Sequence, residues 1–170
     1  NPFNPIESIY NQMIMYSDEY LYITTPYLVI EDYMKQSLIE AAQRGVDVRI
    51  ITPSIPDKKL VKILTYYNYG SLLKEGIRIY EYTPGFVHAK SFVTDDKKAA
   101  VGTINLDFRS LYLHFECGAY MYSNDVLHDV EQDFKETLKQ CQEITKESCD
   151  KYPKGKMLVG KMLRLIAPLM

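Results

Sequence analysis

The sequence has no long hydrophobic run. Among its 170 residues there is no stretch of about 18 apolar, uncharged residues, so no segment is predicted to span a bilayer by itself. The chain begins at Asn1, with no Met and no signal-peptide pattern. We therefore expect it to be a fragment of a longer protein.

Cysteine is scarce, with only Cys117, Cys141 and Cys149 present. An odd number without motif spacing predicts neither a disulfide framework nor a cysteine metal site. Cys117 falls in a strand-like run and Cys141 on a helical pattern, so both are expected in the core. A reducing, cytoplasmic setting fits this usage.

The chain also lacks an excess of basic charge. Its net charge is -2, and residues 151–170 contain five basic side chains and no acid. The other 150 residues therefore carry -7. Because non-specific nucleic-acid affinity comes mostly from neutralising phosphates, we expect no nucleic-acid partner.

Hydrophobic periodicity predicts an α/β fold, with a mixed sheet between helical layers. Helices are expected from Pro5 to about Ile14 and over 31–44, 57–76 and 124–144, with Asp57 as a cap. Strands are expected over 20–25, 46–51, 77–82, 87–94, 99–103 and 115–122. No internal repeat appears. We predict one domain over 1–150 and a basic amphipathic tail over 151–170.

His88 and Lys90 carry the clearest chemical signal. On a strand, residues two apart project from the same face, and an unpaired lysine is costly in a core. The two side chains suit a phosphate: Lys90 offers positive charge, and His88 a nucleophile or proton shuttle. A lone His-x-Lys would more simply be a strand histidine and an edge lysine, with Asp95-Asp96 as a turn.

Further polar residues follow at regular spacing. Gly102 permits close backbone approach, and the Thr103 hydroxyl and Asn105 amide can donate to phosphate oxygens. Glu116, on a neighbouring strand, is the candidate to hold the His88 ring in one tautomer. The joint pattern favours a phosphate site over isolated strand residues.

The pattern His88-x-Lys90-x4-Asp95-x6-Gly102-Thr103-x-Asn105 resembles the HKD signature of the phospholipase D superfamily. The surrounding Phe86–Lys90 and Gly102–Ser110, with Phe115-Glu116 after them, are similar to the second HKD block of bacterial cardiolipin synthases. The resemblance extends over roughly 5–145. One departure is His114, where Asn is expected in many relatives.

The resemblance implies a phospholipase D-like catalytic half-domain, the C-terminal half of such an enzyme. Two halves would meet around a pseudo-two-fold axis, and one His would form a phosphohistidine while the other protonates the leaving alkoxide. The product would be cardiolipin made from phosphatidylglycerol, without metal or cofactor. Carried over, Lys90 and Asn105 bind phosphate and Glu116 orients His88. Asp95 belongs to the motif, but its place after the strand suggests a structural ion pair.

The partners implied are an anionic phospholipid, the N-terminal HKD half or a second copy, and the bacterial cell membrane, with the catalytic domain on its cytoplasmic side. The basic tail either packs on the domain or lies on an anionic leaflet. Two other functions stay open: a homodimeric single-HKD phosphodiesterase or nuclease, and a non-catalytic module that binds anionic lipid. The intact His88, Lys90 and Asn105 weigh against the last.

Overall fold

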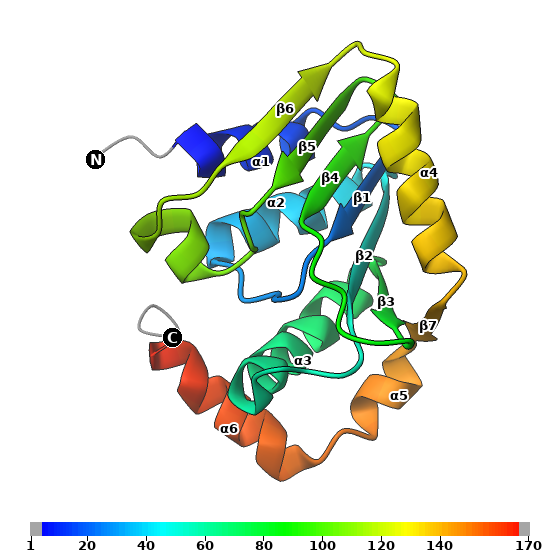
Figure 1. Cartoon of the computed structure of the whole chain (residues 1–170). Helices are drawn as coiled ribbons and strands as arrows, with labels where there is room; N and C mark the ends of the chain where they lie inside the picture. Colours follow the sequence, from blue (N-terminus) through cyan, green and yellow to red (C-terminus); the bar gives the residue numbers. More distant parts are fainter. Residues whose placement is uncertain (1–4, 167–170) are drawn as a thin grey trace.

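A computed structural model describes residues 5–166 as one seven-stranded sheet in the order β6-β5-β4-β1-β2-β3-β7. β1 pairs in parallel with β2, and β2 with β3, whereas the other neighbours are antiparallel. The mixed sheet that the sequence predicts is therefore confirmed (Figure 1). The strands are β1 (Tyr20–Thr24), β2 (Asp47–Pro53), β3 (Arg78–Tyr82), β4 (Ser91–Thr94), β5 (Lys98–Gly102), β6 (Gly118–Tyr122) and β7 (Cys141–Ile144).

Helices cover both faces of the sheet (Figure 1). One face packs mainly against α1, α2 and α3, and the rings of Tyr10 and Phe92 stack there at 4.2 Å. The other face packs against α4, where Tyr22 stacks on Phe134 at 4.7 Å. The helices are α1 (Pro5–Met15), α2 (Asp32–Gln43), α3 (Lys59–Lys74), the π-helix η1 (Arg109–Leu113), α4 (Val126–Leu138), α5 (Lys146–Asp150) and α6 (Lys154–Ile166).

The main departure from the predicted elements lies after α4. The helix expected to reach residue 144 ends at Leu138, and Cys141–Ile144 form a strand on β3. Leu138 and Cys141 keep helical spacing, but pairing with the edge of β3 outweighs that local preference, because an open edge offers unpaired backbone groups. The short helix α5 was not predicted.

Smaller departures concern the ends of elements. α3 begins at Lys59 and has no side-chain cap, because the Asp57 carboxylate accepts a hydrogen bond from Tyr27 Oη at 2.5 Å instead. Cys117 is exposed and Cys141 only half-buried, so the expectation that both lie in the core is wrong. Gly45 ends α2 as expected, at a positive φ of 95° that favours glycine.

Within the predicted tail, Lys154–Ile166 form α6, which lies along α3 (Figure 1), and residues 167–170 lie outside the described part of the chain. Gly160 makes the close approach possible, since a Cβ there would lie 3.0 Å from Tyr67. Arg164 forms an ion pair with Asp32 of α2. Across residues 5–166 there is no helix whose length and apolarity would suffice to cross a membrane.

Candidate active site

The segment before β4 carries His88 and Lys90. β4 begins only at Ser91, so the expectation that both residues lie on a strand is wrong. The segment is still held to the sheet, because Gly102 N donates to Lys90 O at 3.2 Å. Lys90 is 6% exposed, whereas His88 is exposed to solvent. The structure therefore pairs a buried ammonium with an accessible imidazole.

The Lys90 ammonium donates to the carbonyl of His88 at 2.5 Å. Burial lowers the pKa of Lys90, while the negative charges of Glu116 and Asp107 act in the opposite direction. Because solvent screens the charge of a buried ammonium poorly, that charge acts more strongly on a neighbouring group than it would in water, and Glu116 and Asp107 oppose it only in part. Lys90 is therefore suited to bind an anionic group beside His88.

Glu116 and Thr103 contact each other. The Thr103 hydroxyl donates to Glu116 Oε2, and it also accepts a hydrogen bond from Cys117 N at 3.0 Å. His114 Nδ1 lies 3.8 Å from Glu116 Oε1. Within residues 5–166 no hydrogen bond joins Glu116 to the His88 ring, so the predicted orienting contact is not formed in this structure.

Asp95 lies in the turn between β4 and β5 and is 8% exposed. Its carboxylate accepts hydrogen bonds from the backbone N–H groups of Asp18, Glu19 and Tyr20, each at 2.9 Å. Burial acts to raise the pKa of Asp95, but these bonds lower it overall. The expected ion pair is not formed within residues 5–166, and the carboxylate instead binds backbone N–H groups that join the turn to the segment before β1.

Gly102 lies at the end of β5, where β6 comes very close. A Cβ at this position would collide with the Cys117 carbonyl and lie 2.6 Å from Gly118 Cα. The close approach that glycine permits is therefore between two strands. Its predicted contact with substrate, like that of Thr103, remains a prediction.

Asn105 follows β5 and is held by η1. Its Nδ2 donates to Ser110 Oγ at 3.0 Å, whereas its buried Oδ1 has no partner. The side-chain amide can be turned over, which would leave the N–H₂ group free to donate to a phosphate. Asp107 fixes this arrangement by accepting a hydrogen bond from Ser110 N at 2.9 Å.

A cavity of about 210 Å³ opens beside Asn105. Lys58, Arg109 and His114 contribute cationic or titratable groups to its lining, and Val61 and Leu64 contribute apolar surface. The prediction from sequence assigned no role to Lys58, Asp107, Arg109 or Ser110. Asp three residues before a helical Ser is a capping pattern that could have indicated Asp107, but no local pattern indicates Lys58.

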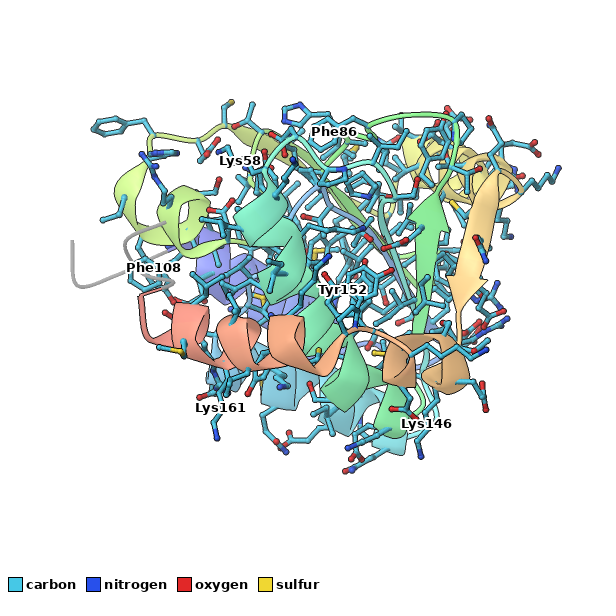
Figure 2. All side chains as sticks on the ribbon, turned by 90° about the horizontal axis from the view of Figure 1, so that it is seen from below. Lys58, Phe86, Phe108, Lys146, Tyr152 and Lys161 are labelled. Carbon is cyan, nitrogen blue, oxygen red and sulfur yellow. The ribbon has the colours of Figure 1, made fainter. Side chains whose placement is uncertain are left out.

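Ring contacts connect His88 to this cavity. The His88 ring lies 5.6 Å from that of Phe86, which in turn lies 6.4 Å from the ring of Tyr27 in the cavity wall. Figure 2 shows Phe86 and Lys58 along the same edge of the molecule. His88 and the cavity therefore belong to one surface region.

The arrangement combines a solvent-accessible imidazole, a buried ammonium and an amide that can turn toward a ligand. Such groups can position a phosphodiester and stabilise the charge that develops during attack on phosphorus. In the described part of the chain, no group of three or more His, Cys, Asp and Glu side chains is placed to hold a metal ion. The expectation of metal-free chemistry rests on the resemblance alone.

Residues 10–138 match the family described as "Cardiolipin synthase, PLD-like domain". A protein of Streptococcus mutans, named only as uncharacterized, is 51% identical over 164 residues, which cover 96% of this chain and 36% of that protein. Cardiolipin synthase 2 of Bacillus cereus is 36% identical over 170 residues, which cover this whole chain and 33% of the enzyme. The chain thus spans about a third of the length of these relatives.

A solved structure shares the fold. Phosphatidylserine synthase of Haemophilus influenzae superposes with a TM-score of 0.77 and 17% identity, over 97% of this chain and 45% of that one. The phospholipase D-like fold predicted from the HKD pattern is confirmed. The chain belongs to the cardiolipin synthase family of phospholipase D-like domains.

Proposed function

We propose that this chain is one half of a phosphatidyltransferase that makes cardiolipin from phosphatidylglycerol. The observation that carries the proposal is the pairing of exposed His88 with buried Lys90 in a chain of this family. A buried lysine whose pKa burial lowers and nearby carboxylates raise is typical of a functional site. The 36% identity to an enzyme named cardiolipin synthase supports the same reaction here.

In the proposed reaction, one His attacks the phosphorus of the donor lipid and forms a P–N bond. The bond from phosphorus to the oxygen of the headgroup glycerol breaks, and the second His gives that oxygen its proton, so that glycerol leaves. A hydroxyl of the acceptor phosphatidylglycerol then attacks phosphorus, the P–N bond breaks, and the hydroxyl proton passes to the second His. His88 takes one of these two roles.

The other residues act on charge and position. Lys90 and Asn105 bind the non-bridging oxygens. The negative charge of Glu116 opposes the effect of burial on the pKa of Lys90 and so helps to keep Lys90 charged. Thr103 holds Glu116, and Gly102 lets β5 and β6 approach closely enough to place both residues. Asp95 stabilises the turn that follows β4.

The site needs a second His, Lys and Asn. The described residues contain one HKD pattern only, and the chain spans about a third of its relatives' length. We propose that an N-terminal HKD half supplies the missing set across a pseudo-two-fold axis. The predicted division into a catalytic half-domain over 1–150 and a tail over 151–170 belongs to the same proposal.

The tail supplies contact with the membrane in this proposal. On α6, Leu158 and Met162 are 63% and 65% exposed, and Lys161 extends away from the helix into solvent (Figure 2). An exposed apolar face flanked by lysine suits an anionic leaflet. We place the protein at the bacterial cell membrane, with the catalytic half on the cytoplasmic side.

Reconstitution tests the proposal. The chain alone should make little cardiolipin from phosphatidylglycerol vesicles. Co-expression with the N-terminal HKD half of a related synthase should restore synthesis, and His88→Ala should abolish it again. His128→Ala is the matched control, because His128 is exposed on α4. Rapid synthesis by the isolated monomer would contradict the half-site, and DNA hydrolysis by a dimer would favour the homodimeric phosphodiesterase.

A further inference from the structure

We propose that the cavity beside Asn105 binds the phosphodiester of the acceptor lipid, through Lys58 and Arg109 with His114 at its rim. The inference rests on the proposed function and deepens it, because it assigns a second anion site to a chain whose His88, Lys90 and Asn105 serve the reacting phosphate. It concerns which acceptor is chosen, and not the cleavage of the donor.

The charges of this cavity favour an anion. Lys58 lies before α3 and Arg109 begins η1, yet both line the same cavity. Within residues 5–166, neither forms an ion pair with a carboxylate. Lys58 Nζ lies 5.3 Å from the centre of the Tyr27 ring, a contact that holds the ammonium without neutralising it.

One acid, Asp107, also lines the cavity. Its Oδ1 accepts the hydrogen bond from Ser110 N, and its charge acts on buried Lys90. Its charge also acts on Tyr27 in the cavity wall, but Lys58 and Arg109 supply two positive charges against this one negative charge. The excess positive charge is available to an anionic ligand, and a guanidinium can bind two oxygens of one phosphodiester.

His114 connects the cavity to the reacting centre from a second direction. Its Nδ1 lies 3.8 Å from Glu116, the carboxylate that acts on Lys90. Asn105 also lines the cavity. Its Oδ1 has no hydrogen-bond partner, so the side-chain amide can turn over and present its N–H₂ group to a ligand. The two anion sites therefore share a wall, as they must when one glycerol joins the two phosphates of the product.

The size of the cavity suits a headgroup. At about 210 Å³ it is smaller than the roughly 300–1,000 Å³ of pockets that enclose drug-sized ligands. It can hold a glycerol phosphodiester above the apolar surface of Val61 and Leu64, while the acyl chains stay outside. The bound phosphodiester is chemically unchanged, since only the free glycerol hydroxyl attacks the phosphohistidine.

Three products report on the site separately, because all arise from the same phosphohistidine. The experiment uses the chain joined to the N-terminal HKD half, phosphatidylglycerol vesicles and isotope-labelled glycerol. Transfer to water gives phosphatidic acid, transfer to glycerol gives labelled phosphatidylglycerol, and transfer to the lipid acceptor gives cardiolipin. Only the last acceptor carries a phosphodiester.

In Arg109→Gln we expect the ratio of cardiolipin to phosphatidic acid to fall about tenfold, as for loss of one charge-assisted hydrogen bond. The ratio of labelled phosphatidylglycerol to phosphatidic acid should not change. Lys58→Gln, on a different element, should act in the same direction. Arg78→Gln is the control, because exposed Arg78 pairs with Glu143 at the far side of the sheet.

The outcomes separate the inference from the function on which it rests. Unchanged product ratios in both variants would overturn the second anion site, and so would an equal loss of all three products, which would indicate donor binding. A wild-type complex that forms none of the three products would overturn the proposed function itself.

Discussion

Asp95 Oδ1 accepts a hydrogen bond from Tyr20 N at 2.9 Å, and this bond joins the β4–β5 turn to the first residue of β1. The same carboxylate accepts from Glu19 N and Asp18 N. Asp95 also adopts a positive φ of 54°, which Asp tolerates better than most residues. Asp95 of the motif therefore holds the segment that leads into β1 against the end of β4.

We expect Asp95→Asn to lower the free energy of unfolding by about 2–4 kcal/mol, because an amide cannot accept all three backbone N–H bonds and buried donors are costly to leave unpaired. Asn also tolerates the positive φ, so the change isolates the carboxylate. Urea unfolding measures the loss. Asp133→Asn, on the exposed side of α4, should stay within about 0.5 kcal/mol of wild type. A stability equal to wild type in Asp95→Asn would contradict the role.

Protonation of Asp95 should also make the free energy of unfolding depend on pH in the acidic range. Its pKa is lowered in the folded chain by backbone hydrogen bonds that outweigh burial. The unfolded chain binds this proton more readily, so the contribution is complete above the ordinary pKa of about 3.9 and is lost as the pH falls through the folded pKa. Unfolding titrations below pH 5 should therefore show a shallower decline for Asp95→Asn than for wild type.

Gly102→Ala should separate β5 from β6. The added methyl group would meet the Cys117 carbonyl and the Gly118 Cα, both backbone atoms that cannot rotate away. We expect a loss of at least about 2 kcal/mol in unfolding free energy and faster hydrogen exchange of the β6 amides. Gly155→Ala is the matched control, since nothing lies within 4 Å of its added Cβ, and it should be neutral or slightly stabilising.

Sequence pattern was sufficient for the features that depend on local order. The apolar face of α2 and the stop at Gly45 lie where helical periodicity places them. Strands over 87–94 and 99–103 were likewise predicted from local pattern, and β4 and β5 lie within those ranges and pair with each other.

The features that sequence did not predict depend on distant pairing. β7 exists because β3 leaves an open edge, and the residues before it keep a helical spacing that gives no sign of this. Glu116 was assigned to His88 from strand order, but the structure places it on Thr103, since Gly102 brings β6 so close. Lys58 and Arg109 lie about fifty positions apart and share a cavity only once α3 and η1 are folded.

Glu116→Gln should lower the pKa of Lys90. Burial already lowers it, and the charge of Glu116 is one of the two that oppose this effect. Because the proposed reaction needs charged Lys90, the alkaline limb of the pH profile for cardiolipin synthesis should move to lower pH in the reconstituted complex. Glu136→Gln, on exposed α4 surface, should leave the limb unchanged. A shift toward higher pH in Glu116→Gln would contradict this account of Lys90.

The outer face of α6 makes a prediction that needs no catalytic activity. Leu158 and Met162 are exposed while Gly160 packs on α3, so Leu158→Ser with Met162→Ser should leave the fold intact. Burying two such side chains in a leaflet is worth roughly 3–6 kcal/mol at most, and we expect the double variant to bind phosphatidylglycerol vesicles at least about tenfold more weakly. Co-sedimentation measures the bound fraction.

Two comparisons decide whether α6 itself contacts lipid. Leu60→Ser removes a side chain of similar exposure from α3 and should bind vesicles as wild type does. Raising the salt concentration should weaken binding of the wild type through Lys161, since screening reduces attraction between an exposed cation and an anionic leaflet. Equal binding by the wild type and the double variant would leave α6 as a helix that only packs on α3, and the membrane contact would have to come from the N-terminal half.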